Sequence, residues 1–192
     1  MNTVYVVRHG ETDWNKAGKY QGIEDIELNQ EGEKQAHQLG RSLKGEHFDL
    51  IVSSHLQRAY KTALIIGEYV GIHKVQVVDG VHERDFGDAS GLTKEERKER
   101  YPDQVIPGME PWETFQERVV QGLVNVMNTY TNKKVIMVSH GGTINAILHK
   151  FSNGEIGTGV TKLNNTCVNI LHFSNNQWQI EKFNCIKHLE IG

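Results

Sequence analysis

Two stretches decide the fold, Val4-Tyr5-Val6-Val7-Arg8-His9-Gly10 and Val135-Ile136-Met137-Val138-Ser139-His140-Gly141. Each is a short, largely β-branched run that stops at a histidine followed by a glycine, as a fully buried parallel strand does where it opens into a loop. In open α/β sheets, ligands bind beyond the carboxyl ends of the strands. This repeated pattern of a strand followed by His-Gly therefore predicts that His9 and His140 share one pocket although they are far apart in the sequence.

The segments between these strands alternate in character. Helices are expected over Asn29–Leu43, where Asn29 suits an N-cap, and over Leu56–Val70, whose apolar residues fall on one face. The remaining predicted elements are strands at Leu50–Ser53 and Val75–Val78, helices over Glu113–Tyr130 and Gly142–Phe151, and a closing antiparallel hairpin over Thr166–Phe173 and Gln177–Phe183. This alternation predicts an α/β fold, a three-layer αβα sandwich with a mixed, mostly parallel sheet.

One segment differs in composition from the rest. Asp85 to Trp112 contains all three prolines and the charged run KEERKER, with few large apolar residues. We interpret residues 85–112 as a small cap over the sheet, inserted in a single domain that spans residues 1–192, a length that suits one compact core. A solvated surface helix followed by a structureless loop fits the same composition.

Composition and charge exclude several classes of partner. The 21 basic and 24 acidic side chains give a net charge of −3, and no block of five basic residues occurs, so no nucleic-acid partner is expected. The apolar run Val4–Val7 is too short for a signal segment or a membrane span, and we expect a cytoplasmic protein that binds no membrane. Cys167 and Cys185 are expected to be reduced thiols without a catalytic role.

The ends of the predicted strands carry chemistry suited to phosphate. Arg8, His9 and Gly10 place a guanidinium, an imidazole and a bare backbone together, and Arg58, at the start of its helix, brings a second permanent cation. A phosphomonoester carries about −1.5 to −2 charges near neutral pH. The two arginines could neutralise most of that charge while an imidazole stays free to react.

A glycine pair and a carboxyl group extend this set. Gly141 and Gly142 open the helix that follows His140, where we expect free backbone N–H groups at the positive end of a helix dipole. Glu83 is the candidate acid that protonates a departing alkoxide. The other histidines form no H-x-H or H-x-x-x-H pair, so no metal site and no cofactor are expected.

Five motifs together resemble the histidine phosphatase superfamily, in its phosphoglycerate-mutase-like branch, over almost the whole chain. They are RHGETDWN (8–15), YQGIEDIELNQEG (20–32), SSHLQRAYKTA (53–63), HERDFGDASG (82–91) and VSHGG (138–142). The resemblance implies that His9 is transiently phosphorylated, that Glu83 donates and later accepts the proton, and that no metal is needed. It further implies a phosphate-binding set consisting of Arg8, Asn15, Gln21, Gly22, Arg58 and His140, to which the helix opening adds Gly141.

The acceptor of the phosphoryl group separates the branches of this family. By this resemblance, the mutases of the family have longer chains with larger insertions that shield the phosphoenzyme, whereas the cap predicted here is short. We therefore favour a phosphatase that acts on small phosphorylated metabolites. The stretches Ala89-Ser90-Gly91 and Met109-Glu110-Pro111 depart from the family on the substrate side. A phosphoglycerate mutase, an α-ribazole phosphatase, a metal-dependent phosphoesterase and a non-catalytic phospholigand-binding module are the alternatives. An apolar strip near Trp112 or the C-terminal hairpin is a candidate homodimer surface.

Overall fold

The computed structural model describes residues 1–190, and residues 191–192 of the predicted 1–192 domain lie outside this part. The strands are β1 (Asn2–Arg8), β2 (Leu50–Ser53), β3 (Val75–Val77), β4 (Lys134–Ser139), β5 (Val168–Ser174) and β6 (Gln177–Cys185). The helices are α1 (Asp13–Lys16), α2 (Gln30–Leu43), α3 (Gln57–Val70), α4 (Lys94–Arg100), α5 (Trp112–Thr129) and α6 (Gly141–Phe151), with 3₁₀ turns η1 (Gly87–Ala89) and η2 (Lys187–Leu189).

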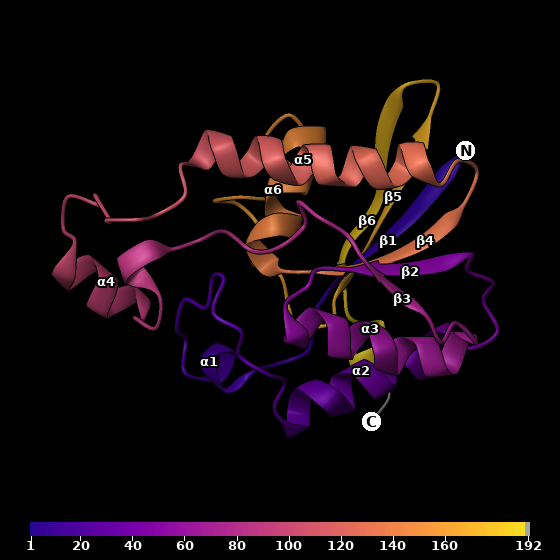
Figure 1. The fold of residues 1–192 in the computed structure, drawn as a ribbon, viewed down its shortest axis with the longest axis horizontal. Helices are drawn as coiled ribbons and strands as arrows, with labels where there is room; N and C mark the ends of the chain where they lie inside the picture. The colour runs from indigo at the N-terminus through magenta and orange to yellow at the C-terminus, as the bar shows by residue number, and fades with distance from the viewer. Residues whose placement is uncertain (191–192) are drawn as a thin grey trace.

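These strands form one mixed sheet in the order β3-β2-β4-β1-β5-β6. The pairs β1·β4, β2·β4 and β2·β3 are parallel, whereas β5 runs antiparallel to β1 and to β6. The β5–β6 hairpin turns at Asn175 and Asn176, which both have positive φ, as a tight hairpin turn requires. Figure 1 shows α5 and α6 on one side of the sheet and α2 and α3 on the other. The predicted three-layer αβα sandwich is confirmed.

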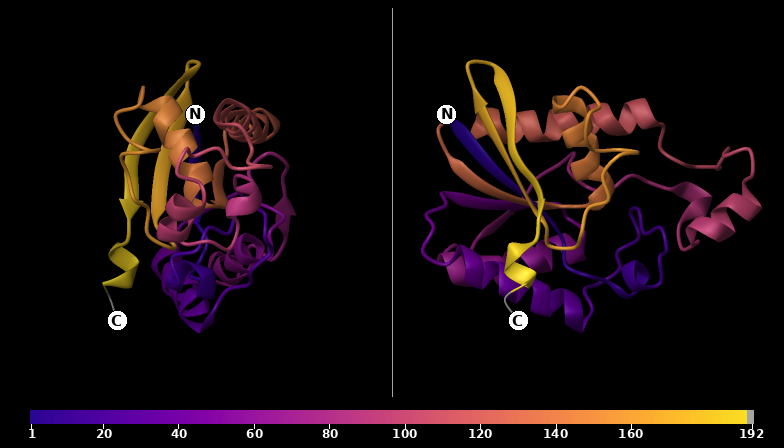
Figure 2. Two further views of the ribbon diagram at one scale, coloured as in Figure 1. Left: turned by 90° about the vertical axis from the view of Figure 1, so that its left-hand side faces the viewer. Right: turned by 180° about the vertical axis from the view of Figure 1, so that it is seen from behind.

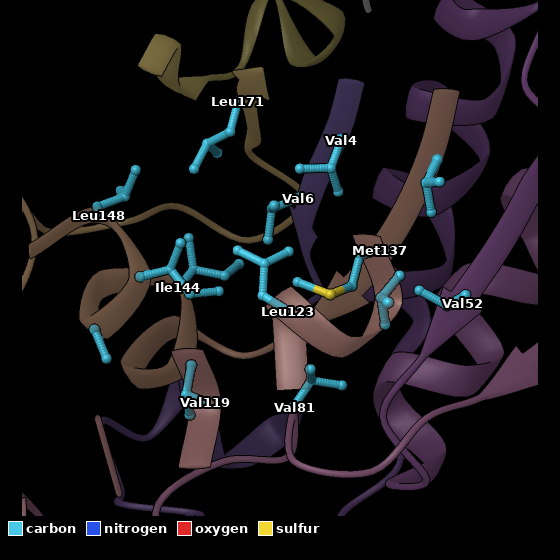
Figure 3. Packing of buried hydrophobic residues seen from close by; sticks show 14 of the residues in the cluster. Val4, Val6, Val52, Val81, Val119, Leu123, Met137, Ile144, Leu148 and Leu171 are labelled. Atoms are coloured by element: carbon cyan, nitrogen blue, oxygen red, sulfur yellow. The ribbon is translucent and has the colours of Figure 1, made fainter. Parts of the chain in front are cut away.

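The core has two halves, one on each face of the sheet. Val4 and Val6 of β1 are fully buried and pack in one cluster with α5 and α6, where Leu123 and Ile144 lie close to them (Figure 3). Val7 belongs to the second cluster, against α2 and α3. Successive side chains of a strand point to opposite faces of the sheet, and both faces are covered here. A slip of one residue would therefore move each side chain of β1 into the layer that it does not fit.

Local signals set the helix boundaries. Asn29 is the N-cap of α2, as predicted, and its side-chain oxygen accepts the Gly32 N–H at 2.9 Å. Helix α3 ends at Gly71, whose φ of 75° closes the helix in the left-handed conformation that glycine favours. The predicted and observed helices therefore agree to within about one residue at these ends.

Gly10 has a packing role that the sequence did not indicate. A Cβ atom on Gly10 would overlap the carbonyl group of Gly32, and one on Gly32 would overlap the carbonyl of Glu11. The loop after β1 thus lies directly on the first turn of α2, and glycine is needed for that approach. Gly10, which the sequence analysis grouped with Arg8 and His9 for its bare backbone, therefore also serves this packing contact.

The segment 85–112 holds η1 and α4 and lies beside the loop that follows β1. Isolated β-bridges join Lys19 to Thr93 and Phe86 to Met109. Thr93 starts α4 with a capping box, and no residue of α4 is buried. Figure 2 shows α4 and α1 together at one end of the molecule, away from the N-terminus. Backbone pairing therefore attaches the segment to the loop after α1, at Lys19 and Tyr20.

Two further observations concern the chain as a whole. Cys167 and Cys185 are both free thiols, as predicted, and burial raises the pKa of Cys167 to about 11. Within residues 1–190, none of the helices has the length and apolar character needed to cross a membrane.

Candidate active site

A pocket of about 160 Å³ lies at the carboxyl ends of β1 and β4. Small-molecule pockets usually occupy roughly 300–1,000 Å³, so this one suits a small group rather than a large ligand. It contains every phosphate-binding residue predicted from the sequence except His140, and its lining is Arg8, His9, Asn15, Lys19, Tyr20, Gln21, Gly22, Arg58, Glu83, Phe86, Gly141 and Gly142.

A larger cavity, of about 1160 Å³, lies beside α1 and the start of α2. Two lysines and five carboxylates line it, the carboxylates being Glu11, Asp13, Asp25, Glu27 and Glu31. This excess of negative charge would repel a phosphate group. The smaller pocket, with its two arginines, is therefore the candidate active site.

His9 follows β1 directly and is 2% exposed. Its Nδ1 lies 2.7 Å from the carbonyl oxygen of Gly10. Since a carbonyl oxygen can only accept, Nδ1 carries the hydrogen, and the neutral ring keeps its lone pair at Nε2. Burial, and then the nearby charges of Arg58 and Arg8, hold the pKa of His9 well below its ordinary value of 6.5. The ring is therefore a neutral base whose reactive nitrogen is defined.

His140, which follows β4, lies next to His9 but is fully buried and does not line the pocket. The two ring centroids are 5.2 Å apart. The Nε2 atom of His140 lies 2.9 Å from Ser54 Oγ, which also accepts the Leu56 N–H. Burial, followed by the charge of Arg58, holds the pKa of His140 well below 6.5. Ser54 can thus donate to Nε2 of a neutral ring, which leaves a hydrogen on Nδ1.

The two arginines are held by carbonyl oxygens, Arg58 as a buried cation and Arg8 as a partly buried one. Arg58, in the first turn of α3, donates to the carbonyls of Gly22 at 2.7 Å and Glu24 at 2.6 Å. Arg8 donates to the carbonyl of Leu163 at 2.5 Å. Burial lowers the pKa of Arg58 to about 10, so it stays charged at neutral pH. Among the described residues, the Nε atoms of both arginines have no hydrogen-bond partner, and an unpaired buried donor of this kind can be satisfied by a bound ion or water.

Glu83 enters the pocket from the loop after β3 and is 8% exposed. Its carboxylate accepts the backbone N–H groups of Arg84 and Gly142, both at 2.9 Å. Arg118 of α5 donates to the carbonyls of Gly80, His82 and Glu83 and so fixes the loop. The prediction that the Gly142 N–H is free for an anion is therefore wrong, because this N–H holds the acid.

Two amide side chains reach the pocket with their oxygens already engaged. The buried Thr12 hydroxyl lies 2.7 Å from Gln21 Oε1 and 3.2 Å from Asn15 Oδ1. Asn15 Oδ1 also accepts from the Thr12 N–H and from Asn165 Nδ2. Since both oxygens are occupied, the NH₂ groups are the parts available to a ligand, and these are donors suited to phosphate oxygens.

Sequence reasoning missed a second set of residues. Lys19, Tyr20 and Phe86 line the pocket, and the Tyr20 and Phe86 rings lie 5.0 Å apart. Thr12 stands inside the first motif and could have been noticed there. Asn165 precedes β5 in a run of polar loop residues, and nothing in its sequence context indicates a contact with the site. In residues 1–190, no cluster of three or more His, Cys, Asp or Glu side chains is arranged to hold a metal ion.

A neutral buried imidazole, two guanidiniums, two oriented amides and a carboxyl group lie together at this end of the sheet, a set of groups whose chemistry suits a phosphoryl group. The family model of the histidine phosphatase superfamily (branch 1) matches residues 4–186. The chain belongs to this superfamily.

Individual relatives agree with this assignment. The chain is 44% identical to the uncharacterized phosphatase PhoE of Bacillus subtilis over 189 residues, covering 98% of this chain and 97% of the relative. It is 33% identical to a metal-independent phosphoserine phosphatase of Arabidopsis thaliana, with 98% and 84% covered. A mutant phosphoserine phosphatase of Entamoeba histolytica, solved with phosphoserine, superposes with a TM-score of 0.82 at 29% identity, with 98% and 100% covered. These likenesses support phosphatase activity.

Replacing Thr12 with valine should weaken the binding of inorganic phosphate. The change keeps the shape of the side chain but releases the Gln21 oxygen, which can then turn toward the anion and repel it, whereas Asn15 Oδ1 keeps its bonds to the Thr12 N–H and to Asn165. We expect the affinity for phosphate, measured by calorimetry, to fall about tenfold. Thr12→Ser keeps the hydroxyl and should bind phosphate as the unchanged protein does. Equal affinities in all three proteins would contradict the orienting role of Thr12.

His9 should remain neutral when the solution is made mildly acidic. Because burial and two neighbouring cations disfavour the imidazolium form, the lowered pKa keeps the Nδ1–H tautomer in place as pH falls through 6.5, where an ordinary histidine gains its proton. Nitrogen-15 NMR of histidine-labelled, ligand-free protein reports both ring nitrogens, and His9→Ala identifies the signals. An imidazolium signal from His9 at pH 6 would contradict this expectation.

Proposed function

We propose that this protein is a metal-independent phosphomonoesterase that hydrolyses small phosphorylated metabolites through a phosphohistidine on His9. One observation carries the proposal: the Nδ1–H of His9 is bound to the Gly10 carbonyl, which leaves the lone pair on Nε2 in a pocket that also holds Arg8 and Arg58. A binding module would need the arginines but no histidine prepared as a nucleophile. The name of the Arabidopsis relative makes phosphoserine the first substrate to test.

In the first step, His9 Nε2 attacks phosphorus in line with the leaving oxygen. The P–O bond breaks as the N–P bond forms, and protonated Glu83 gives its proton to the departing alkoxide, which leaves as an alcohol. Arg8, Arg58 and the amides of Asn15 and Gln21 stabilise the equatorial oxygens. Removing a single prearranged donor of this kind costs about 10²–10³ in rate.

In the second step, water attacks the phosphohistidine. Glu83, now a carboxylate, accepts a proton from the water, the N–P bond breaks, and phosphate leaves with neutral His9 restored. We assign His140 a supporting role beside His9, in which its Nδ1–H donates to a phosphoryl oxygen. This atom is buried and has no partner among the residues described. The backbone at Gly22 and Gly141 completes the proposed phosphate site.

We propose that residues 85–112 form the short cap over this site. Phe86 contributes to the pocket from this segment, and the bridge between Lys19 and Thr93 attaches it to the opposite wall. A short cap leaves water free to reach the phosphohistidine, which favours hydrolysis over transfer to a second organic acceptor. A cytoplasmic location and a homodimer stay predictions from the sequence.

A phosphoglycerate mutase reaction is the alternative within the same family. It would need His9 to be phosphorylated by a bisphosphorylated sugar acid and the phosphoryl group to be protected from water. An isomerisation assay with and without the bisphosphate separates the two reactions, and we expect hydrolysis only. A panel of phosphomonoesters ranked by kcat/KM, with α-ribazole phosphate included, then separates narrow from broad specificity.

Replacing His9 with alanine should abolish turnover and phosphoryl labelling while the fold survives. The unchanged enzyme, quenched within one turnover of a ³²P-labelled phosphomonoester, should carry an acid-labile, base-stable label, as a phosphohistidine does. His9→Ala should carry none and should keep its circular dichroism spectrum. A folded and active His9→Ala protein would rule out His9 as the nucleophile, and EDTA should leave the unchanged enzyme active.

Replacing Glu83 with glutamine should separate the two steps. With 4-nitrophenyl phosphate as the substrate, the 4-nitrophenolate leaves without a proton. This substrate should therefore still phosphorylate His9 in Glu83→Gln and release a burst of one equivalent of 4-nitrophenolate, after which phosphoenzyme accumulates. An alkyl phosphate needs the proton and should react about 10²–10⁴ slower, with no burst.

The matched control for this experiment is Asp88→Asn, which removes an exposed carboxylate from the same motif, HERDFGDASG (82–91). It should behave as the unchanged enzyme with both substrates. Equal losses for the two substrates in Glu83→Gln would contradict the role of Glu83 as a general acid.

A further inference from the structure

The main chain of His9 is held from two sides. Its N–H donates to the carbonyl of Ser139 in β4 at 3.0 Å, as the strand pairing requires. Its carbonyl oxygen accepts the Thr166 N–H at 3.3 Å and Asn165 Nδ2 at 3.1 Å. Asn165 and Thr166 belong to the loop before β5, which supplies no reacting group in the mechanism proposed above but holds Arg8 through the Leu163 carbonyl and Asn15 through Asn165. The nucleophile therefore depends on a loop far from it in sequence.

Asn165 links the same carbonyl group to the pocket. Its Nδ2 also lies 3.1 Å from Asn15 Oδ1, so the two hydrogens of one amide serve both partners. That second contact keeps the Asn15 oxygen away from the anion. Asn165 thus couples the position of the His9 backbone to the orientation of a phosphate-binding amide.

Thr166 adopts a conformation that its side chain disfavours. Its φ is 55°, in the left-handed region that β-branched residues rarely enter, and the residue is fully buried. Its hydroxyl shares a 3.0 Å hydrogen bond with Nε2 of His188. His188 lies in η2, which packs against α2, and its side chain is buried. Burial lowers the pKa of His188 to about 4, so the ring is neutral at neutral pH.

We propose that Asn165 and Thr166 are positioning residues for His9, and that His188 holds them in place from η2. The inference rests on the proposed function, because it requires His9 to be the nucleophile. Without the bond to His188, Thr166 can relax from its left-handed conformation, and its N–H then moves off the His9 carbonyl. The imidazole would shift relative to a phosphoryl group that Arg58, held by the carbonyls of Gly22 and Glu24, still binds.

The expected signature is a loss of chemistry without a loss of binding. A small displacement of a nucleophile lowers the rate of the chemical step far more than it changes the affinity for the ground state. Inorganic phosphate reports the binding set, whereas orthovanadate, which can add a fifth ligand from His9, reports the nucleophile in its transition-state position. A residue that serves stability alone would change neither quantity in the folded protein.

The chain contains a matched control for this test. Thr3 Oγ1 and His172 Nδ1 form a second threonine–histidine hydrogen bond, also of 3.0 Å. Thr3 lies at the opposite end of β1 from the site. Thr3→Val therefore removes a hydroxyl from the same kind of pair, on the strand that leads to His9 but at its far end, where no effect on catalysis is expected.

The experiment compares Thr166→Val, Thr166→Ser and Thr3→Val with the unchanged enzyme. In Thr166→Val, kcat and the affinity for orthovanadate should each fall about tenfold, while the affinity for inorganic phosphate stays constant. Thr166→Ser keeps the hydroxyl and should restore both values, and Thr3→Val should match the unchanged enzyme.

Two results would overturn the proposal: an unchanged kcat in Thr166→Val, or equal losses of kcat and of phosphate affinity. Should Thr166→Val fail to fold, His188→Phe decides by the same measurements, because it removes only the partner of the hydroxyl. Failure of the proposed function is distinguishable, since the unchanged enzyme would then show no turnover and no label on His9.

Discussion

The parallel register between β1 and β4 is the constraint on which the site depends. Arg8 pairs with Ser139, so the next residues along the two strands are His9 and His140, and their rings come to 5.2 Å. Both strands are covered on both faces, which specifies this register strongly. A shift of one residue would send the alternate apolar side chains to the wrong layer and part the two imidazoles. The energy that places the two histidines is therefore mostly the burial of valine and isoleucine.

Around this pair, the protein removes charged and polar groups from water and gives each a defined orientation. Arg58 is 1% exposed and is held by two carbonyl groups. Burying a guanidinium is unfavourable unless polar groups surround it, and such a preformed arrangement needs little reorganisation when charge develops on a phosphoryl group. The same burial lowers the pKa of both histidines and so keeps both rings neutral beside two cations, as the proposed roles of His9 and His140 require.

The sequence predicts the fold and most of the pocket because their signals are local. Strand ends marked by His-Gly, the Asn29 cap and the Asn175–Asn176 turn each follow from neighbouring residues. The predictions from the sequence that failed concern contacts between distant segments. The N–H of Gly142 is occupied by Glu83, and Gly10 serves the packing of α2; neither contact leaves a trace in local periodicity. The role of Asn165 depends on how the loop before β5 meets β1, which only the three-dimensional arrangement shows.

The strand order has a consequence for biosynthesis. β1 is made first, yet its two neighbours in the sheet, β4 and β5, begin only at Lys134 and Val168. During translation, His9 therefore leaves the ribosome long before β4, the strand that brings His140 beside it. Non-local pairing of this kind closes late. A nascent or prematurely terminated chain would carry the motif RHGETDWN but could not hydrolyse phosphoesters. The protein therefore becomes active only when its synthesis is nearly complete.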